Sequence, residues 1–434
     1  MITPFALAIG TFLITYALIL TERINRALLA LAGAGILILG DVLSQEEAIH
    51  AIDFNTLGLL LGMMVIVTIT KETGLFQYLA LHAAQKVKGK PMGLMLMMAL
   101  VTAVCSALLD NVTTVLLVTP VILSLTDKLK VSPWPFLVST IFASNIGGTA
   151  TLVGDPPNIM IGSAVGLSFN DFLVHLAPLS VVVMLATFVP MAFIWRKQLV
   201  TTDALRASIM KEKPRKSLTN RTLLINCLLT LLVVLIGFLT HGITGLEPAS
   251  VALAGAVLLL LLETYNHDSE KQHHKVQTAV AEAEWVTLLF FVGLFVLVHG
   301  LVKVGAISMM AEYMISLTHG DMKLTATYLL WGSAVFSAIV DNIPYVATMI
   351  PLLQEMAPSF GGKEAMMPLW WSLAAGACLG GNGSLIGASA NLVVAGLAAK
   401  QGVHIKFGKF LLVAFPFMLL SIAITHVYIM VRYF

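Results

Sequence analysis

Long apolar runs, each close to the length of a membrane-spanning helix, constrain this chain more than any other feature. A bilayer core of about 30 Å needs roughly 20 apolar helical residues. Uninterrupted candidates occupy residues 4–20, 25–41, 54–70, 172–195, 222–240, 248–263, 285–301 and 410–431. Only 11% of the 434 residues are charged, which is too few to cover a surface that faces water. We therefore predict an all-α integral membrane protein that lies in a lipid bilayer.

Four further apolar runs are interrupted by polar residues and glycines. The breaks fall at Asp110-Asn111 in 92–126, at Gly147-Gly148 and Gly154–Pro157 in 133–165, at Asp341–Pro344 in 325–352, and at Gly380–Ser384 in 369–398. If 92–126 and 325–352 are re-entrant hairpins while the other two runs cross as discontinuous helices, the chain makes about ten crossings. Of the 25 Lys and Arg residues, all but Lys303, Lys323, Lys363 and Arg432 then share the side of the basic segment 196–221, which is predicted to be cytoplasmic.

The two halves of the chain repeat each other. Ser106–Val112 recurs as Ser337–Ile343 at an offset of 231, and Thr151–Gly154 recurs as Ser384–Gly387 at an offset of 233. Five elements cross between the starts of the two copies, and an odd number inverts the second copy. The predicted organisation is N-terminal helices at 1–53, a first repeat at 54–195, a basic loop with connecting helices at 196–284, and a second repeat at 285–434. Inverted repeats with broken helices are typical of secondary transporters.

Three carboxylates stand in these breaks. Asp110 and Asp341 occupy matched positions, whereas Asp155 has Ala388 as its counterpart. A carboxylate inside a membrane is expensive and usually functional, so each could couple transport to a proton or a cation. Each also precedes an expected helix, where aspartate commonly caps backbone N–H groups. Asp155 is the best candidate for a role that only one copy performs.

Short polar side chains and glycines surround the carboxylates. Amides and hydroxyls could bind a substrate, and glycines would allow the backbone to approach it closely. The alternative is tight helix packing by small residues. The predicted substrate-binding residues are Asn111, Thr113, Asn145, Gly147, Gly148, Thr149, Thr151, Asn158, Asn342, Asn382, Gly383, Ser384 and Asn391.

Other features limit the choice of function. No Lys or Arg lies in the breaks, which favours a neutral substrate or a cation over a polycarboxylate. Cys105 and Cys378 lie near the breaks, where a thiol could meet a thiophilic substrate. They are not matched between the two copies, so we expect both to be small buried hydrophobes. The chain has no HExxH motif, so we expect no enzyme, no cofactor and no bound metal. A net charge of +2 gives no reason to expect nucleic acid.

The segments Ala143–Thr151, Gly154–Asn158 and Ser337–Tyr345 resemble the ion transporter superfamily, in the branch of arsenite permeases, the melanosomal P protein and sodium/proton antiporters. The resemblance implies a carrier of the inner (plasma) membrane with two hairpins and two unwound helices that works by an elevator-like motion. In the arsenite branch it implies export of arsenite or antimonite driven by proton entry. A homodimer and an ATPase subunit that docks on residues 196–221 are the protein partners that the resemblance admits.

We therefore predict a proton-coupled arsenite and antimonite exporter. Asn111, Asn145, Thr149 and Asn382 would hold the metalloid, and one of the three aspartates would carry the proton. A sodium/proton antiporter remains the first alternative. A dicarboxylate carrier of the same superfamily is less expected, because the hairpin tips lack its Ser-Asn-Thr triplets. An ion channel is an alternative from a different class.

Overall fold

The computed structural model describes residues 3–21, 23–265 and 268–434, and every regular element within them is a helix. The uninterrupted apolar runs form helices, as predicted. The run 172–195 is an exception, because it is divided between α10 (Phe169–His175) and α11 (Ala177–Trp195). Pro178 lies in the first turn of α11, a position that proline favours, and it cannot continue a preceding helix.

Seven helices of the described chain are long and apolar enough to cross a membrane. They are α4 (Phe54–Glu72), α6 (Pro91–Leu108), α7 (Asn111–Leu129), α11, α13 (Arg221–Thr244), α16 (Trp285–Lys303) and α22 (Phe407–Tyr433). Shorter apolar helices are α1 (Pro4–Leu20), α2 (Arg26–Leu39), α14 (Pro248–Thr264) and α21 (Ser389–Lys400). Their outer surfaces expose large apolar side chains, such as Leu185 and Phe193 of α11. Lipid solvates such a surface well, so the chain is a multi-pass membrane protein.

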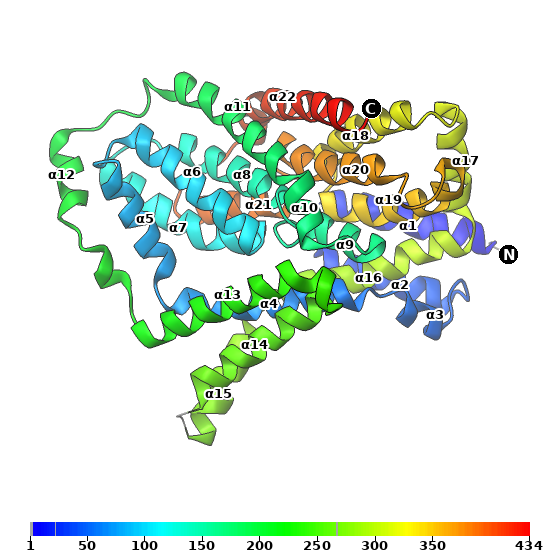
Figure 1. The fold of residues 1–434 in the computed structure, drawn as a ribbon, viewed down its shortest axis with the longest axis horizontal. Coiled ribbons are helices and arrows are strands. Elements are labelled where there is room, and N and C mark those ends of the chain that lie inside the picture. The colour runs from blue at the N-terminus through cyan, green and yellow to red at the C-terminus, as the bar shows by residue number, and fades with distance from the viewer. Residues whose placement is uncertain (1–2, 22, 266–267) are drawn as a thin grey trace.

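One group of helices, α1, α2, α4, α13, α14 and α16, forms what we call the framework. In Figure 1, α4, α13 and α16 lie in a row across the lower part of the view, and α14 slopes down from this row. Glycines allow two close helix contacts within it. A Cβ added to Gly62 of α4 would lie 2.6 Å from the backbone of Ala252 in α14. A Cβ on Gly293 of α16 would lie 2.5 Å from the backbone of Ala30 in α2.

The interrupted runs form a second group, which we call the core. It contains the hairpins α6–α7 and α18 (Met322–Ile339)–α19 (Asn342–Met356). It also contains the interrupted helices α8 (Trp134–Thr149)–α9 (Pro156–Val165) and α20 (Met367–Gly380)–α21, together with α11 and α22. Equivalent bonds join the pairs α6–α8 and α18–α20. The Ser106 hydroxyl donates to the Ser144 carbonyl at 2.6 Å, and the Ser337 hydroxyl donates to the Ala377 carbonyl at 2.6 Å.

One of the predicted interruptions, at Gly147-Gly148, does not lie where the sequence placed it. Helix α8 continues through Gly147 and Gly148, and the non-helical stretch is 150–155. In the second copy, a 3-10 turn η3 (Gly381–Gly383) follows α20, and residues 384–388 are non-helical. The expected break at Gly147-Gly148 is therefore wrong. Gly147 instead allows α8 to pack on α6, since an added Cβ would lie 2.2 Å from the Ala103 carbonyl oxygen.

The remaining elements lie at the edges of these two groups. Helices α5 (Leu75–Lys86) and α17 (Ala306–Thr318) follow Gly74 and Gly305, whose φ angles of 74° and 79° favour glycine. The basic segment forms α12 (Asp203–Lys211) and η1 (Pro214–Ser217), and α12 lies at the left edge of Figure 1. The last elements are α3 (Gln45–His50), α15 (Ser269–Ala281) and η2 (Ala357–Phe360).

Candidate functional site

Four predicted asparagines meet in the interior of the core. Asn111 begins α7, Asn145 lies on α8, Asn382 lies in η3 and Asn391 lies on α21. The Asn111 amide donates to Asn145 Oδ1 at 3.3 Å, and the Asn145 amide donates to Asn382 Oδ1 and Asn391 Oδ1, both at 3.0 Å. None of the four side chains belongs to a residue more than 2% exposed. The two copies therefore contribute to one buried polar cluster.

Asp155 extends this cluster. It is fully buried and accepts from the Asn342 amide at 3.2 Å and 3.4 Å. The Asn111 side chain and the Cys378 thiol also lie near its carboxylate. Asp155 precedes α9 but its side chain does not cap that helix, so the capping interpretation is wrong for this residue. The carboxylate faces the other copy instead.

Cys378 belongs to the same cluster, although the sequence favoured a plain hydrophobic role for it. Its thiol donates to Asn158 Oδ1 at 3.5 Å. At the offset of 233, Cys378 is the counterpart of Asn145, and each reaches across to the asparagine of the opposite copy: Cys378 to Asn158, and Asn145 to Asn391. That alignment with Asn145 is the signal that could have revealed the position of Cys378.

Asn158 and Asn391 also hold the non-helical segments in place. The Asn158 amide donates to three carbonyls within residues 148–151, at 2.9–3.3 Å. The Asn391 amide donates to the carbonyls of Gly381 and Ser384, at 2.7 Å and 2.8 Å. Backbone groups that a helix break releases must find such partners when they are buried. These two asparagines therefore serve the backbone through Nδ2 and the cluster through Oδ1.

Other predicted binding residues bond to backbone carbonyls or allow helices to pack closely. The hydroxyls of Thr151 and Ser384 donate to hairpin carbonyls, those of Ala107 at 2.6 Å and Ala338 at 2.5 Å. Glycines 147, 148 and 383 allow close packing, because an added Cβ on any of them would lie within 2.7 Å of a neighbouring atom. Thr149 bonds back to the Asn145 carbonyl at 2.7 Å and also contacts the Cys378 thiol.

The two hairpin-tip aspartates cap their helices, as expected. Asp110 accepts from the Thr113 backbone N–H at 2.7 Å, and Asp341 accepts from the Ile343 N–H at 3.2 Å. The Thr113 side chain lines a cavity of about 340 Å³ with Glu284 and lies apart from the asparagines.

A cation nevertheless stands at one hairpin tip, contrary to the expectation drawn from the breaks. Arg26 Nη1 lies 2.8 Å from Asp341 Oδ2. Arg26 begins α2, far from the breaks in sequence, so no local pattern indicates this contact.

Two polar atoms of the cluster have no hydrogen-bond partner within the described protein. They are the acceptor Asn111 Oδ1 and the donor Asn382 Nδ2, and both belong to residues bonded to Asn145. Buried polar groups are rarely left unpaired in folded proteins. A ligand that carries hydroxyl groups can satisfy both atoms.

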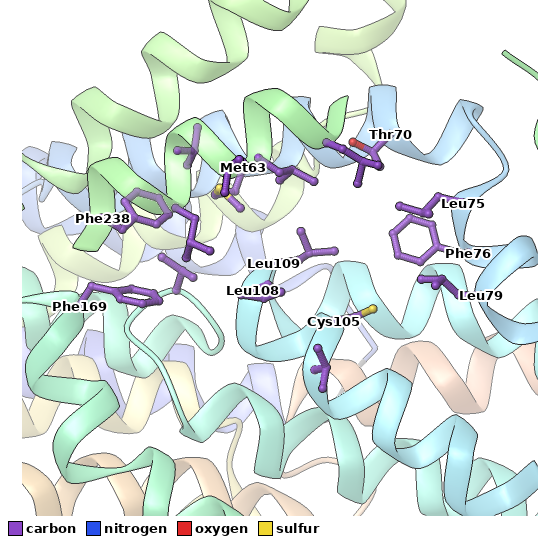
Figure 2. Close-up of a pocket in the computed structure, with 17 residues that line it drawn as sticks. Met63, Thr70, Leu75, Phe76, Leu79, Cys105, Leu108, Leu109, Phe169 and Phe238 are labelled. Carbon is purple, nitrogen blue, oxygen red and sulfur yellow. The ribbon is translucent and has the colours of Figure 1, made fainter. Parts of the chain in front are cut away.

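Cys105 occupies a different environment from Cys378. It lines an apolar cavity of about 290 Å³ between α4, α5, α6 and α13, and Figure 2 shows its sulfur among Leu108, Leu109 and Leu79. Cys105 is only partly buried, and its apolar surroundings fit a small hydrophobe better than a thiol that binds a substrate.

Interrupted helices that enclose a buried polar cluster between two packed halves define a membrane transporter. The family described as citrate transporter, CitMHS, matches residues 16–376. The chain belongs to this family, within the ion transporter superfamily.

Relatives agree with this class, and a solved structure has a similar fold. An uncharacterised transporter of Mycobacterium tuberculosis is 40% identical over 431 residues, which cover 98% of each chain. The P protein of Mus musculus is 34% identical over 499 residues, which cover 96% of this chain and 59% of the P protein. The YdaH transporter of Alcanivorax borkumensis has a similar fold, with a TM-score of 0.53 and 15% identity over 87% of this chain and 85% of that one.

Proposed function

We propose that this protein is a secondary carrier of the inner (plasma) membrane that exports arsenite or antimonite in exchange for protons. The observation that carries the proposal is the Cys378 thiol, which lies inside the polar cluster beside Asp155. Trivalent arsenic and antimony are thiophilic, and their hydroxides are neutral at physiological pH. A site that combines amides, one carboxylate and one thiol matches a neutral hydroxylated metalloid better than it matches a polyanion.

The unpaired atoms of the cluster suit such a substrate. Asn111 Oδ1 can accept from one metalloid hydroxyl, and Asn382 Nδ2 can donate to another. The Asp155 carboxylate would accept a hydrogen bond from a further metalloid hydroxyl. One of the three aspartates would carry the proton: proton entry from outside would weaken the hold on the substrate, and proton release inside would restore it.

The proposal includes two inverted repeats, at 54–195 and 285–434, and about ten crossings. Equivalent hydrogen bonds in the two copies support the duplication. Two ion pairs support the sidedness, since each joins helix ends that the prediction places on the same face. Lys71 lies 3.3 Å from Glu282 on the predicted cytoplasmic side, and Lys303 lies 2.6 Å from Glu47 on the opposite side.

The test is uptake into everted membrane vesicles, which would concentrate an exported substrate. We expect arsenite to accumulate with saturating kinetics when the vesicle interior is acidified, and the pH gradient to collapse in step. Cys378→Ala should reduce arsenite accumulation at least about tenfold, the scale of one lost ligand interaction. Cys227→Ala is the matched control, since Cys227 is equally buried but lies on α13 of the framework.

Three results would contradict the proposal. Proton release on addition of sodium, without arsenite flux, would establish the sodium/proton antiporter. Passive conductance that does not saturate would indicate a channel. Citrate uptake without arsenite flux would establish a carboxylate carrier.

The carboxylate carrier is a second candidate because the matching family is described as citrate transporter and because Arg26 stands at a hairpin tip. Against it, Arg26 is already paired with Asp341, and the cluster itself contains the Asp155 carboxylate. A polycarboxylate would need cations bound with it to offset that repulsion. Replacing sodium by choline in the citrate assay would measure that requirement.

A further inference from the structure

The matched aspartates at the two hairpin tips have different surroundings. Both are nearly buried, with 5% of Asp110 and 8% of Asp341 exposed, and both cap the helix that follows. Asp341 also has a cationic partner, as described above. No Lys or Arg of the described chain forms an ion pair with Asp110. The duplication is therefore equal in backbone geometry and unequal in charge.

The contact around Asp341 is a closed triad. Arg26 Nη1 donates to Asp341 Oδ2 at 2.8 Å and to the Ser389 hydroxyl at 2.6 Å, and that hydroxyl donates to the same Oδ2 at 2.5 Å. The guanidinium also lies over the Phe290 ring, 4.9 Å from its centre. Arg26 belongs to the framework, whereas Asp341 and Ser389 belong to the core. Since arginine stays protonated, its guanidinium brings a permanent positive charge to this contact between framework and core.

A carboxylate, not a cation, lies in the neighbourhood of Asp110. Glu284, which immediately precedes α16, lines the cavity of about 340 Å³ together with Thr113, whose backbone N–H donates to Asp110. Lys71 lines the same cavity but is paired with Glu282. Glu284 also interacts electrostatically with Asp110. The two tip aspartates therefore differ in their charged neighbours, Glu284 for Asp110 and Arg26 for Asp341.

We propose that Arg26 is a positioning residue that gives the two tip aspartates different tasks: it holds Asp341 as a fixed counter-ion that ties α2 to the second hairpin, and it leaves Asp110 with Glu284 as the pair that carries the proton. Two neighbouring carboxylates without a committed cation can hold one proton between them. The coupling task rests on the proposed proton exchange. The tie between framework and core stands on the triad alone.

Loss of either Arg26 or Asp341 alone should destabilise the protein more than loss of both. Arg26→Gln leaves the Asp341 charge uncompensated in the interior, and Asp341→Asn does the same to Arg26. The double substitution removes both charges, and the exchange R26D/D341R restores an opposite pair. Purified protein is therefore compared by its apparent unfolding midpoint in detergent. We expect both single variants to lower the midpoint, and both double variants to recover at least half of the loss.

Reconstituted liposomes separate the two tasks. Arsenite-for-arsenite exchange needs no net proton movement, whereas accumulation driven by a pH gradient does. We expect Asp110→Asn and Glu284→Gln to retain exchange and to lose at least about tenfold in driven accumulation. We expect Arg26→Gln and Asp341→Asn to reduce both activities together, Arg26→Lys to restore part of each, and R26D/D341R to restore more.

Each part of the proposal, the tie between framework and core and the division of tasks between the two aspartates, has a result that would overturn it. Additive midpoint losses in the double variant Arg26→Gln/Asp341→Asn, with no recovery by charge exchange, would overturn the tie. Retained exchange with lost accumulation in Asp341→Asn, and unchanged accumulation in Asp110→Asn, would overturn the division of tasks. If wild-type liposomes carry no arsenite at all, the proposed function and the coupling task fail, while the unfolding midpoints still decide the tie between α2 and the hairpin.

Discussion

Replacing Gly147 by alanine tests the closest contact between a hairpin and an interrupted helix. The added Cβ would lie 2.2 Å from the Ala103 carbonyl oxygen and 2.6 Å from its Cα, whereas ordinary contact begins near 3.4 Å. Helices α6 and α8 must therefore separate by about 1 Å, because the obstacle is backbone and cannot rotate away. The Ser106–Ser144 bond of 2.6 Å, which joins the same helices, would lengthen with them.

The magnitude follows from two opposing effects. Overpacking of this kind costs about 1–3 kcal/mol, and an obstacle made of backbone places it at the upper end. Alanine recovers up to about 1 kcal/mol because glycine is a poor helix former. Gly147→Ala should therefore destabilise the protein by about 2 kcal/mol. The matched control is Gly332→Ala within α18, where an added Cβ meets no atom within 4 Å and should stabilise by up to about 1 kcal/mol.

Equilibrium unfolding in mixed detergent micelles, followed by helical circular dichroism, measures both variants. The two should differ by about 3 kcal/mol, which is large compared with the effect of a typical surface substitution. Equal unfolding free energies for Gly147→Ala and Gly332→Ala would refute the close packing of α8 on α6. Lost transport at unchanged stability would instead show that Gly147 allows the backbone to approach a ligand.

Three further variants address the interruptions and one surface ion pair. Thr151→Val removes a hydroxyl bonded to a buried hairpin carbonyl and should cost about 1–3 kcal/mol in the same assay, with recovery by Thr151→Ser. Asn158→Ala leaves up to three buried carbonyls without their donor and should cost at least as much. The Lys303 ammonium and the Ser44 backbone N–H lower the pKa of Glu47 from 4.5 to about 2. Stabilisation by the ionised Glu47 should persist above pH 4.5 and disappear as the pH falls through 2, which carboxyl NMR titration and the stability of Glu47→Gln can follow.

The sequence predicts well the features that depend on neighbouring residues along the chain. Twenty-residue apolar runs must be helical in a bilayer, because backbone groups find no other hydrogen-bond partners there. The tips at Asp110 and Asp341 were predictable for a similar reason, since an aspartate placed between two helical runs can cap the second one. The interruption before α9 follows from Pro156 and Pro157, which begin a helix but cannot continue one.

The sequence predicts poorly the features that depend on contacts between residues far apart along the chain. Two consecutive glycines are compatible with a break or with close packing, and only the approach of Ala103 decides for packing at Gly147. Arg26 comes from a helix that precedes every break, so its contact with Asp341 requires the fold. The sequence favours a hydrophobic role for Cys378 because no cysteine matches it in the first copy, whereas the residue that does match it is Asn145 of the cluster.

The two copies are alike in the residues that hold the interruptions and differ in the side chains of the shared cluster. Bonds that hold the interruptions together occur twice, because each copy must satisfy the same released backbone groups: Thr151 matches Ser384, and Asn158 matches Asn391. Side chains at the shared cluster differ instead, as Asn145 and Cys378 do. A site enclosed by identical copies would present the same groups from both sides, and could not place one thiol and one carboxylate around a single ligand. The two copies therefore differ at positions that line the cluster, where Cys378 takes the place of Asn145 and Ala388 that of Asp155, and in the cation at one hairpin tip.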